Sequence, residues 1–165
     1  MTIRVGERAP DFELPGRRDP DSREYEMHRL SKELTERPVI LHFFPAPFTS
    51  TCERQMCAVR DEIDLYAGAG VTVWGVTGHY PQMIAAWAKE HHFGVPILAD
   101  YEHEVSERYV GTYPPELFGG LRHMSKRAVV AVGQDGAIRY AWVADVSSEA
   151  PSDEVVAKAL ASLKS

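Results

Sequence analysis

The stretch PVILHFFPAPFTSTCERQMC, residues 38–57, contains the sharpest change of pattern in this chain. Residues 38–45 form a nearly continuous apolar run between two prolines, and their β-branched and aromatic content predicts a buried parallel strand. After Pro47 the apolar residues recur at helical spacing, and we expect one helix that ends at Gly68 and Gly70. The core-facing stripe of that helix is expected to consist of Cys52, Met56, Val59, Ile63 and Tyr66.

The pattern on either side of this stretch predicts an α/β fold with a mixed central sheet flanked by helices. The polar residues before it predict loop and short strand. After it we expect buried strands at Val71–Thr77 and Pro96–Ala99, helices at Pro81–His92 and Glu102–Val110, a hairpin from Ala128–Val132 and Ala137–Val143, and a last helix that starts at the N-cap Ser152. The segment Gly111–Met124 has no periodic pattern and is expected to be irregular.

Length and composition limit the class of protein. With 165 residues and a mass of 18.5 kDa, the chain fits a single domain over residues 1–165. Apolar residues make up 44% and charged residues 25%, which excludes a disordered, fibrous or disulfide-scaffold protein. A net charge of −6 argues against nucleic acid or an anionic membrane as the partner, and no run reaches the ~20 apolar residues of a membrane span. The N-terminal residues lack the apolar region of a signal peptide, so we expect a cytoplasmic protein.

Cys52 lies where the predicted buried strand turns into the predicted helix, and sites in open α/β sheets form at such junctions. The free N–H groups and the positive dipole end of a helix N-terminus favour a thiolate over a thiol, and the thiolate is the nucleophile. Cys52 is therefore a candidate nucleophile. The alternative is that it is only a small buried residue on the apolar stripe.

The residues before Cys52 favour the first interpretation. Pro45, Thr49 and Cys52 form the pattern Pro-x-x-x-Thr-x-x-Cys, which resembles the active-site motif of the peroxiredoxins, thiol peroxidases with a thioredoxin-like fold. Other segments that resemble the family occur in family order, among them VGERAPDF (residues 5–12) and KRAVV (residues 126–130). The resemblance covers roughly residues 5–160 and implies a thioredoxin-like α/β fold.

The resemblance implies a role for each motif residue. Cys52 is the expected peroxidatic cysteine, and Thr49 is expected to place its hydroxyl against the thiolate and the bound peroxide. Pro45 is expected to wall the pocket, and Arg127 matches the distal arginine of the family. Charge develops along the O–O bond as it breaks, so fixed donors aimed there lower the barrier. Taken singly, Thr49 fits a helix cap, Pro45 the end of a strand and Arg127 a surface charge.

Two polar residues near the motif each have two interpretations. Gln55 occupies a position where the family usually has Glu or Gln, and it is otherwise a solvated helix residue. His42 interrupts the central strand, and a buried, hydrogen-bonded histidine is favoured over one that lines the site.

Cys57 follows Cys52 by five residues and falls on the polar side of the predicted helix, where an exposed thiol suggests a partner in redox chemistry. The Cys-x-x-x-x-Cys spacing resembles the bacterioferritin comigratory protein subgroup of peroxiredoxins, which implies that Cys57 is the resolving cysteine. Residues five apart in a regular helix have Cα atoms about 8.6 Å apart, and a disulfide needs less than ~7 Å, so a Cys52–Cys57 bond requires the helix to unwind. The alternative is an unused surface thiol, with a reductant's thiol resolving Cys52 directly.

The resemblance implies an antioxidant enzyme that reduces hydrogen peroxide and organic hydroperoxides, forms an intramolecular disulfide and is restored by a thioredoxin-type dithiol. No metal, haem or flavin cofactor is implied, and both a monomer and a homodimer remain open. Two other classes also remain. One is a thiol–disulfide oxidoreductase on the same fold, although the chain lacks Cys-x-x-Cys. The other is a chaperone-like binding module whose cysteines are incidental.

Overall fold

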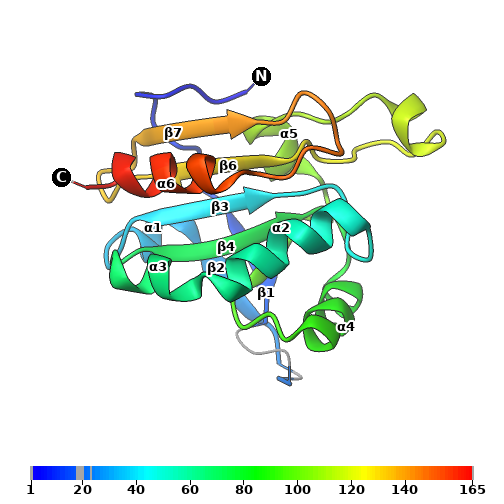
Figure 1. Ribbon diagram of the computed structural model, residues 1–165, viewed down its shortest axis with the longest axis horizontal. Helices are drawn as coiled ribbons and strands as arrows, with labels where there is room; N and C mark the ends of the chain where they lie inside the picture. The colour runs from blue at the N-terminus through cyan, green and yellow to red at the C-terminus, as the bar shows by residue number, and fades with distance from the viewer. Residues whose placement is uncertain (1, 18–20, 23, 165) are drawn as a thin grey trace.

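The computed structural model describes residues 2–17, 21–22 and 24–164 (Figure 1). Its strands are β1 (Glu13–Gly16), β2 (Glu26–Arg29), β3 (Val39–Phe43), β4 (Thr72–Thr77), β5 (Ile97–Ala99), β6 (Ala128–Val132) and β7 (Ile138–Val143). Its helices are α1 (Leu30–Glu33), α2 (Ser50–Asp61), α3 (Ile63–Gly68), α4 (Pro81–His91), α5 (Glu104–Tyr109) and α6 (Asp153–Ser162), together with the short 3-10 helix η1 (Pro115–Phe118).

The strands of the described residues form one mixed sheet in the order β2-β1-β5-β4-β3-β6-β7. The central strands β5, β4 and β3 run parallel, whereas the strands on both sides pair antiparallel. The α/β fold expected from the sequence is therefore confirmed. The register places Phe43, at the end of β3, opposite Ala128, at the start of β6. As a result, the loop after β3 and the residue before β6 lie at the same edge of the sheet.

Alternation of side chains along β3 divides the core into two halves. Val39, Leu41 and Phe43 pack on one face of the sheet with residues of α1 and α5. Ile40 and Phe44 pack on the opposite face with residues of α2, α3, α4 and α6. Figure 1 shows these four helices in front of the sheet and α1 and α5 behind it. Because both faces are covered, every residue of β3 is buried, which accounts for its nearly continuous apolar sequence.

The helix expected after Pro47 is two helices. Glu62, between α2 and α3, leaves the helical conformation at φ −108° and ψ 18°. This break interrupts the regular rotation of side chains around the helix axis, so Tyr66 stays buried whereas Ile63 is 36% exposed. The prediction of one continuous apolar stripe was therefore wrong at Ile63.

In the second half of the chain, the observed elements agree more closely with those expected from the sequence. The β6–β7 hairpin forms, and Ser152 caps α6 by accepting a hydrogen bond from the N–H of Val155 over 3.3 Å. The segment Gly111–Met124 contains only η1 as a regular element.

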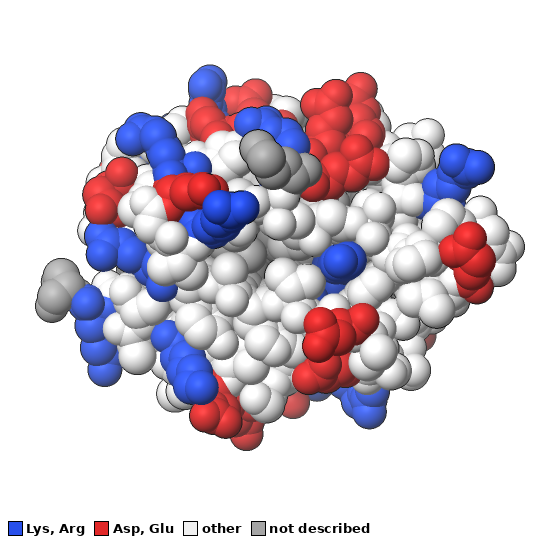
Figure 2. Space-filling view, turned by 90° about the horizontal axis from the view of Figure 1, so that it is seen from above, with Lys and Arg blue, Asp and Glu red and all other residues white. Residues whose placement is uncertain are grey.

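Figure 2 shows acidic and basic residues interspersed on the face seen from above, so the net charge forms no single-signed surface there. Among the helices of the described residues, none combines the length and the apolar composition that crossing a bilayer requires.

Gly16 provides a test of how closely β1 and β5 pack. A Cβ at this position would lie 2.7 Å from Cδ2 of Leu98 and 3.2 Å from the backbone oxygen of Ile97, and the backbone cannot move aside easily. We expect Gly16→Ala to lower the free energy of unfolding by about 1–3 kcal/mol in denaturant titrations. Gly94→Ala is the matched control, because a Cβ there would meet no atom within 4 Å. Equal stability of the two variants would contradict this account.

Candidate active site

Cys52 is the third residue of α2, and its side chain is only 1% exposed. The strand before it ends at Phe43, and a short loop with buried Pro45 and Pro47 leads to the N-cap Thr49. The N–H groups in the first turn of a helix have no acceptor within the helix and favour negative charge nearby. The junction predicted from the sequence therefore places the sulfur at a buried position beside the unpaired N–H groups of the first helical turn.

Arg127 reaches the same position from the far part of the chain. It immediately precedes β6 and is 2% exposed, although arginine is rarely buried without partners. Its Nη1 donates to Sγ of Cys52 over 3.3 Å and to Oε1 of Gln55 over 2.9 Å. The structure thus brings together two of the predicted site residues, which are 75 positions apart in the sequence. The guanidinium is a permanent cation held against the sulfur.

The opposite edge of the guanidinium is anchored to the backbone. Nε and Nη2 of Arg127 both donate to the carbonyl oxygen of Ser147, over 3.1 and 2.7 Å. The backbone N–H of Arg127 donates to the hydroxyl of Tyr113 over 3.2 Å, and that hydroxyl donates to the carbonyl of Ala144 over 3.0 Å. These bonds leave Arg127 little freedom to turn away from Cys52.

A chain of buried polar side chains continues inward from Arg127. Nε2 of Gln55 lies 3.1 Å from Nδ1 of His42, and Nε2 of His42 lies 3.2 Å from the hydroxyl of Tyr66. Burial lowers the pKa of His42 to about 4, so its imidazole is neutral at physiological pH. The expectation of a buried, hydrogen-bonded His42 is confirmed, and Gln55 is buried rather than solvated.

Pro45 and Thr49 lie in the loop that precedes Cys52. Pro45 is buried, and its carbonyl accepts hydrogen bonds from Oγ1 of Thr77 over 3.3 Å and from Nε2 of His79 over 3.2 Å. The Thr49 hydroxyl donates to the carbonyl of Ala46 over 2.9 Å and does not cap α2 through its side chain. These contacts shape the loop, and they leave the lone pairs of the Thr49 hydroxyl oxygen for a further donor.

Cys57 is half-buried and packs at the margin of the core on the α2 side of the sheet. The prediction of an exposed thiol was therefore wrong, because Cys57 packs against the buried cluster on this face of the sheet. Arg60 of α2 donates to the carbonyl of His91 in α4 over 2.7 Å, and the His91 imidazole lies 3.2 Å from a carboxylate oxygen of Glu53. Burial raises the pKa of the Cys57 thiol, and the Arg60 cation partly opposes this shift. Both cysteines are free thiols.

Ser147 and Tyr113 are the site residues that sequence reasoning missed. Ser147 contributes only a carbonyl, which every residue has, so no side-chain signal marks it. Tyr113 lies in the irregular segment before β6, where no periodicity indicates which side chains turn inward. His42, by contrast, could be found from the sequence, because it is a polar residue within an otherwise apolar strand.

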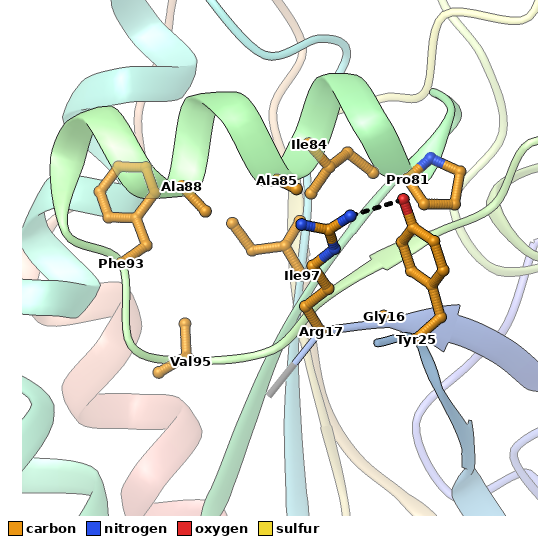
Figure 3. A pocket seen from close by; sticks show the side chains of 10 residues that line it. All are labelled: Gly16, Arg17, Tyr25, Pro81, Ile84, Ala85, Ala88, Phe93, Val95 and Ile97. Carbon is orange, nitrogen blue, oxygen red and sulfur yellow. Dashed lines mark hydrogen bonds between the residues drawn. The ribbon is translucent and has the colours of Figure 1, made fainter. Parts of the chain in front are cut away.

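An apolar pocket elsewhere in the molecule is separate from this site. It lies between α4 and the β1–β5 side of the sheet, and none of its described lining residues belongs to the site (Figure 3). At its rim, Arg17 donates to the hydroxyl of Tyr25 over 2.8 Å.

Within the described residues, no group of three or more His, Cys, Asp or Glu side chains is placed to hold a metal ion. The chemistry offered by the described site is that of a buried thiol beside a cation.

Comparison with known proteins identifies the family of this chain. The sequence model of the AhpC/TSA family matches residues 5–141. The chain is 28% identical to the putative peroxiredoxin bcp of Coxiella burnetii over 86% of its own length and 89% of that protein. It is 26% identical to the peroxiredoxin Bcp of Escherichia coli over 85% of both chains.

Solved structures show the same similarity. The peroxidoxin BcpB of Mycobacterium tuberculosis superposes with a TM-score of 0.77 at 27% identity, over 97% of this chain and 96% of that one. A reduced 2-Cys peroxiredoxin of Plasmodium vivax shares the fold, with a TM-score of 0.81 at 19% identity, over 95% of this chain and 80% of that one. The thioredoxin-like fold implied by the resemblance is therefore confirmed. Since the family model spans most of the sequence, the chain belongs to the AhpC/TSA family, the peroxiredoxins.

Proposed function

We propose that this protein is a thiol-dependent peroxidase in which Cys52 is the peroxidatic cysteine and Arg127 is its catalytic cation. The observation that carries the proposal is the buried 3.3 Å contact between Nη1 of Arg127 and Sγ of Cys52. A guanidinium at this distance stabilises the thiolate before the reaction and the negative charge that spreads along the O–O bond during it. Membership of the AhpC/TSA family supports the same chemistry.

In the first step, the Cys52 thiolate attacks one oxygen of hydrogen peroxide or of an organic hydroperoxide. An S–O bond forms as the O–O bond breaks, and the second oxygen leaves as hydroxide or alkoxide, which takes up a proton to give water or an alcohol. Cys52 is oxidised to the sulfenic acid and the peroxide is reduced. Arg127 holds its position during this step, because its other edge is bonded to Ser147.

Thr49 and Pro45 complete the proposed pocket. The Thr49 hydroxyl already donates to Ala46, so its oxygen is oriented to accept a hydrogen bond from the incoming peroxide. Pro45 is buried at the end of the central strand and offers no N–H, so it limits water next to the thiolate. Both roles follow those of the matching motif residues in the family.

Cys57 is the proposed resolving cysteine. Its thiol condenses with the Cys52 sulfenic acid, so that an S–S bond forms and one water leaves. Both residues lie within the same regular helix, α2, where a spacing of five residues keeps the Cα atoms about 8.6 Å apart, beyond the ~7 Å limit for a disulfide. We therefore propose that the first turns of α2 unwind. Unwinding also exposes Cys57, which removes the burial that raises its pKa.

The cycle closes when a thioredoxin-type dithiol reduces the disulfide by exchange and becomes oxidised itself. Two free thiols and a need for a reducing partner fit action in the cytoplasm, where such partners keep thiols reduced. We propose a single domain, because the strands of the described residues form one sheet and the site draws on both halves of the chain. No step requires a residue of a second copy, so a monomer or a homodimer can carry the cycle.

The function is tested by mixing the reduced protein with one equivalent of hydrogen peroxide and following its intact mass. We expect rapid loss of two hydrogens in the native protein and no rapid change in Cys52→Ser. The Cys57→Ser variant should instead gain one oxygen, because its sulfenic acid cannot be resolved. Oxidation no faster than that of free cysteine would contradict the peroxidase assignment and favour a binding module.

Arg127→Lys tests the role of the guanidinium. Lysine keeps the charge, but a single ammonium cannot bridge Ser147 on one side and Cys52 on the other. We expect the second-order rate constant for hydrogen peroxide to fall about 100-fold in stopped-flow measurements. Arg139→Lys is the control, because Arg139 pairs with Asp135 on the surface and should leave the rate unchanged. A second-order rate constant for Arg127→Lys equal to that of the native protein would exclude the proposed role.

Hydrogen exchange tests the unwinding of α2. We expect amide exchange to accelerate across residues 49–60 when the native protein is oxidised, while α6 stays protected. The Cys57→Ser variant should show no such change after oxidation. Unchanged protection of residues 49–60 in the disulfide form would mean that the bond forms without local unfolding.

A further inference from the structure

His42 is a polar residue in the middle of the central strand, at a position where the surrounding pattern is apolar. It lies on the face of the sheet that α2 and α3 cover, and it is the fourth of five members of a hydrogen-bonded chain that starts at the cysteine. The members of this chain, none more than 3% exposed, are Cys52, Arg127, Gln55, His42 and Tyr66. A buried polar group in such a chain costs free energy unless every bond is made, so its bond pattern is informative.

The orientation of the Gln55 amide is determined by its neighbours. Arg127 has only donors, so the atom that faces its Nη1 at 2.9 Å must be the oxygen of Gln55. On the other side, the Gln55 nitrogen lies 3.4 Å from the carbonyl oxygen of Phe43, which can only accept. Both contacts require the same amide orientation. The Gln55 nitrogen therefore donates to Nδ1 of His42 as well.

This orientation determines the tautomer of His42. Since Nδ1 accepts from Gln55, the single proton of the neutral imidazole is on Nε2, which donates to the hydroxyl of Tyr66. A charged imidazole would have donors on both nitrogens and would oppose the Gln55 nitrogen. Burial keeps the pKa of His42 low, which agrees with the neutral form that the geometry requires.

We propose that His42 is a positioning residue for the peroxidase reaction. Its Nδ1 accepts from the Gln55 nitrogen and so reinforces the amide orientation that Arg127 and Phe43 require and that keeps Arg127 on the sulfur of Cys52. The inference rests on the proposed function, because it concerns the same site. Nη1 of Arg127 is shared between the Cys52 sulfur and the Gln55 oxygen. If the Gln55 amide turned over, two donors would face each other and the guanidinium would lose its second support near the sulfur. The bond to Nδ1 of His42 adds to the contacts with Arg127 and Phe43 that oppose this turn.

The test compares His42→Phe with His42→Asn, both in a Cys57→Ser background that leaves one thiol. Phenylalanine fills the space and removes the acceptor, whereas the asparagine amide restores an acceptor close to the position of Nδ1. We expect His42→Phe to slow the oxidation of Cys52 by hydrogen peroxide about ten-fold and to move the alkylation of Cys52 by iodoacetamide to higher pH. His42→Asn should recover most of both properties. Gln55→Leu should abolish the effect, so that His42→Phe causes no further change in that background.

A control variant distinguishes a positioning role of His42 from a general effect of lost stability on the reactivity of Cys52. Tyr109→Phe removes a buried hydroxyl that donates to the carbonyl of Pro10, on the opposite side of the sheet. We expect it to lower the melting temperature without changing the reactivity of Cys52. A folded His42→Phe variant with native peroxide and alkylation profiles would overturn the inference. An equal further loss in the Gln55→Leu background would also overturn it, because His42 would then act by another route.

Two readouts do not depend on peroxidase activity. If Cys52 of the native protein reacted with peroxide no faster than free cysteine, the proposed function would fail, but the alkylation profiles would still decide the role of His42. If His42→Phe did not fold, nitrogen-15 NMR of the native imidazole would decide it. We expect a proton on Nε2 and none on Nδ1 at neutral pH. The opposite tautomer would contradict the proposed orientation of Gln55.

Discussion

The contact between Arg127 and Cys52 is the interaction on which the rest of this site depends. It joins residues 75 positions apart, and the pairing of β3 with β6 makes it possible. Because Phe43 lies opposite Ala128, the chain leaves β3 toward Cys52 at the edge where Arg127 enters β6. A shift of this register by one residue would turn the strand side chains to the other face and displace the guanidinium from the sulfur.

Burying a guanidinium in a protein core has a large desolvation cost. The hydrogen bonds that the surrounding residues accept from it offset this cost. Ser147 accepts from one edge of Arg127, and Gln55 and Cys52 accept from the other. The chain then continues through His42 to Tyr66. A network of this kind is rigid when all its bonds are made, and rigidity is useful where a donor must face a developing charge.

The proposed resolution step works against this rigidity. A peroxide-reactive Cys52 needs an intact α2, whereas a bond to Cys57 needs the same helix to open. The contact of Glu53 with His91 of α4 lies in the first turns of α2, which must move, whereas Arg60 binds the carbonyl of His91 from the last turn. The Glu53–His91 contact is a single, half-exposed interaction, which is weaker than the buried bonds around Arg127. The proposed opening would therefore exchange this contact and the first turns of α2 for one covalent bond.

The sequence by itself determined the order of the elements from β3 onward, the strand–helix junction that carries Cys52 and the motif of Pro45, Thr49 and Cys52, because periodicity and short motifs are local properties. It did not predict the break at Glu62 or the half-burial of Cys57, since these depend on how α3 and α4 pack. Only the tertiary structure placed Arg127 on the sulfur and linked it through Gln55 to His42. Those contacts join strands and helices that are distant along the chain, and hydrogen bonds between such elements exist only once the sheet register has been set.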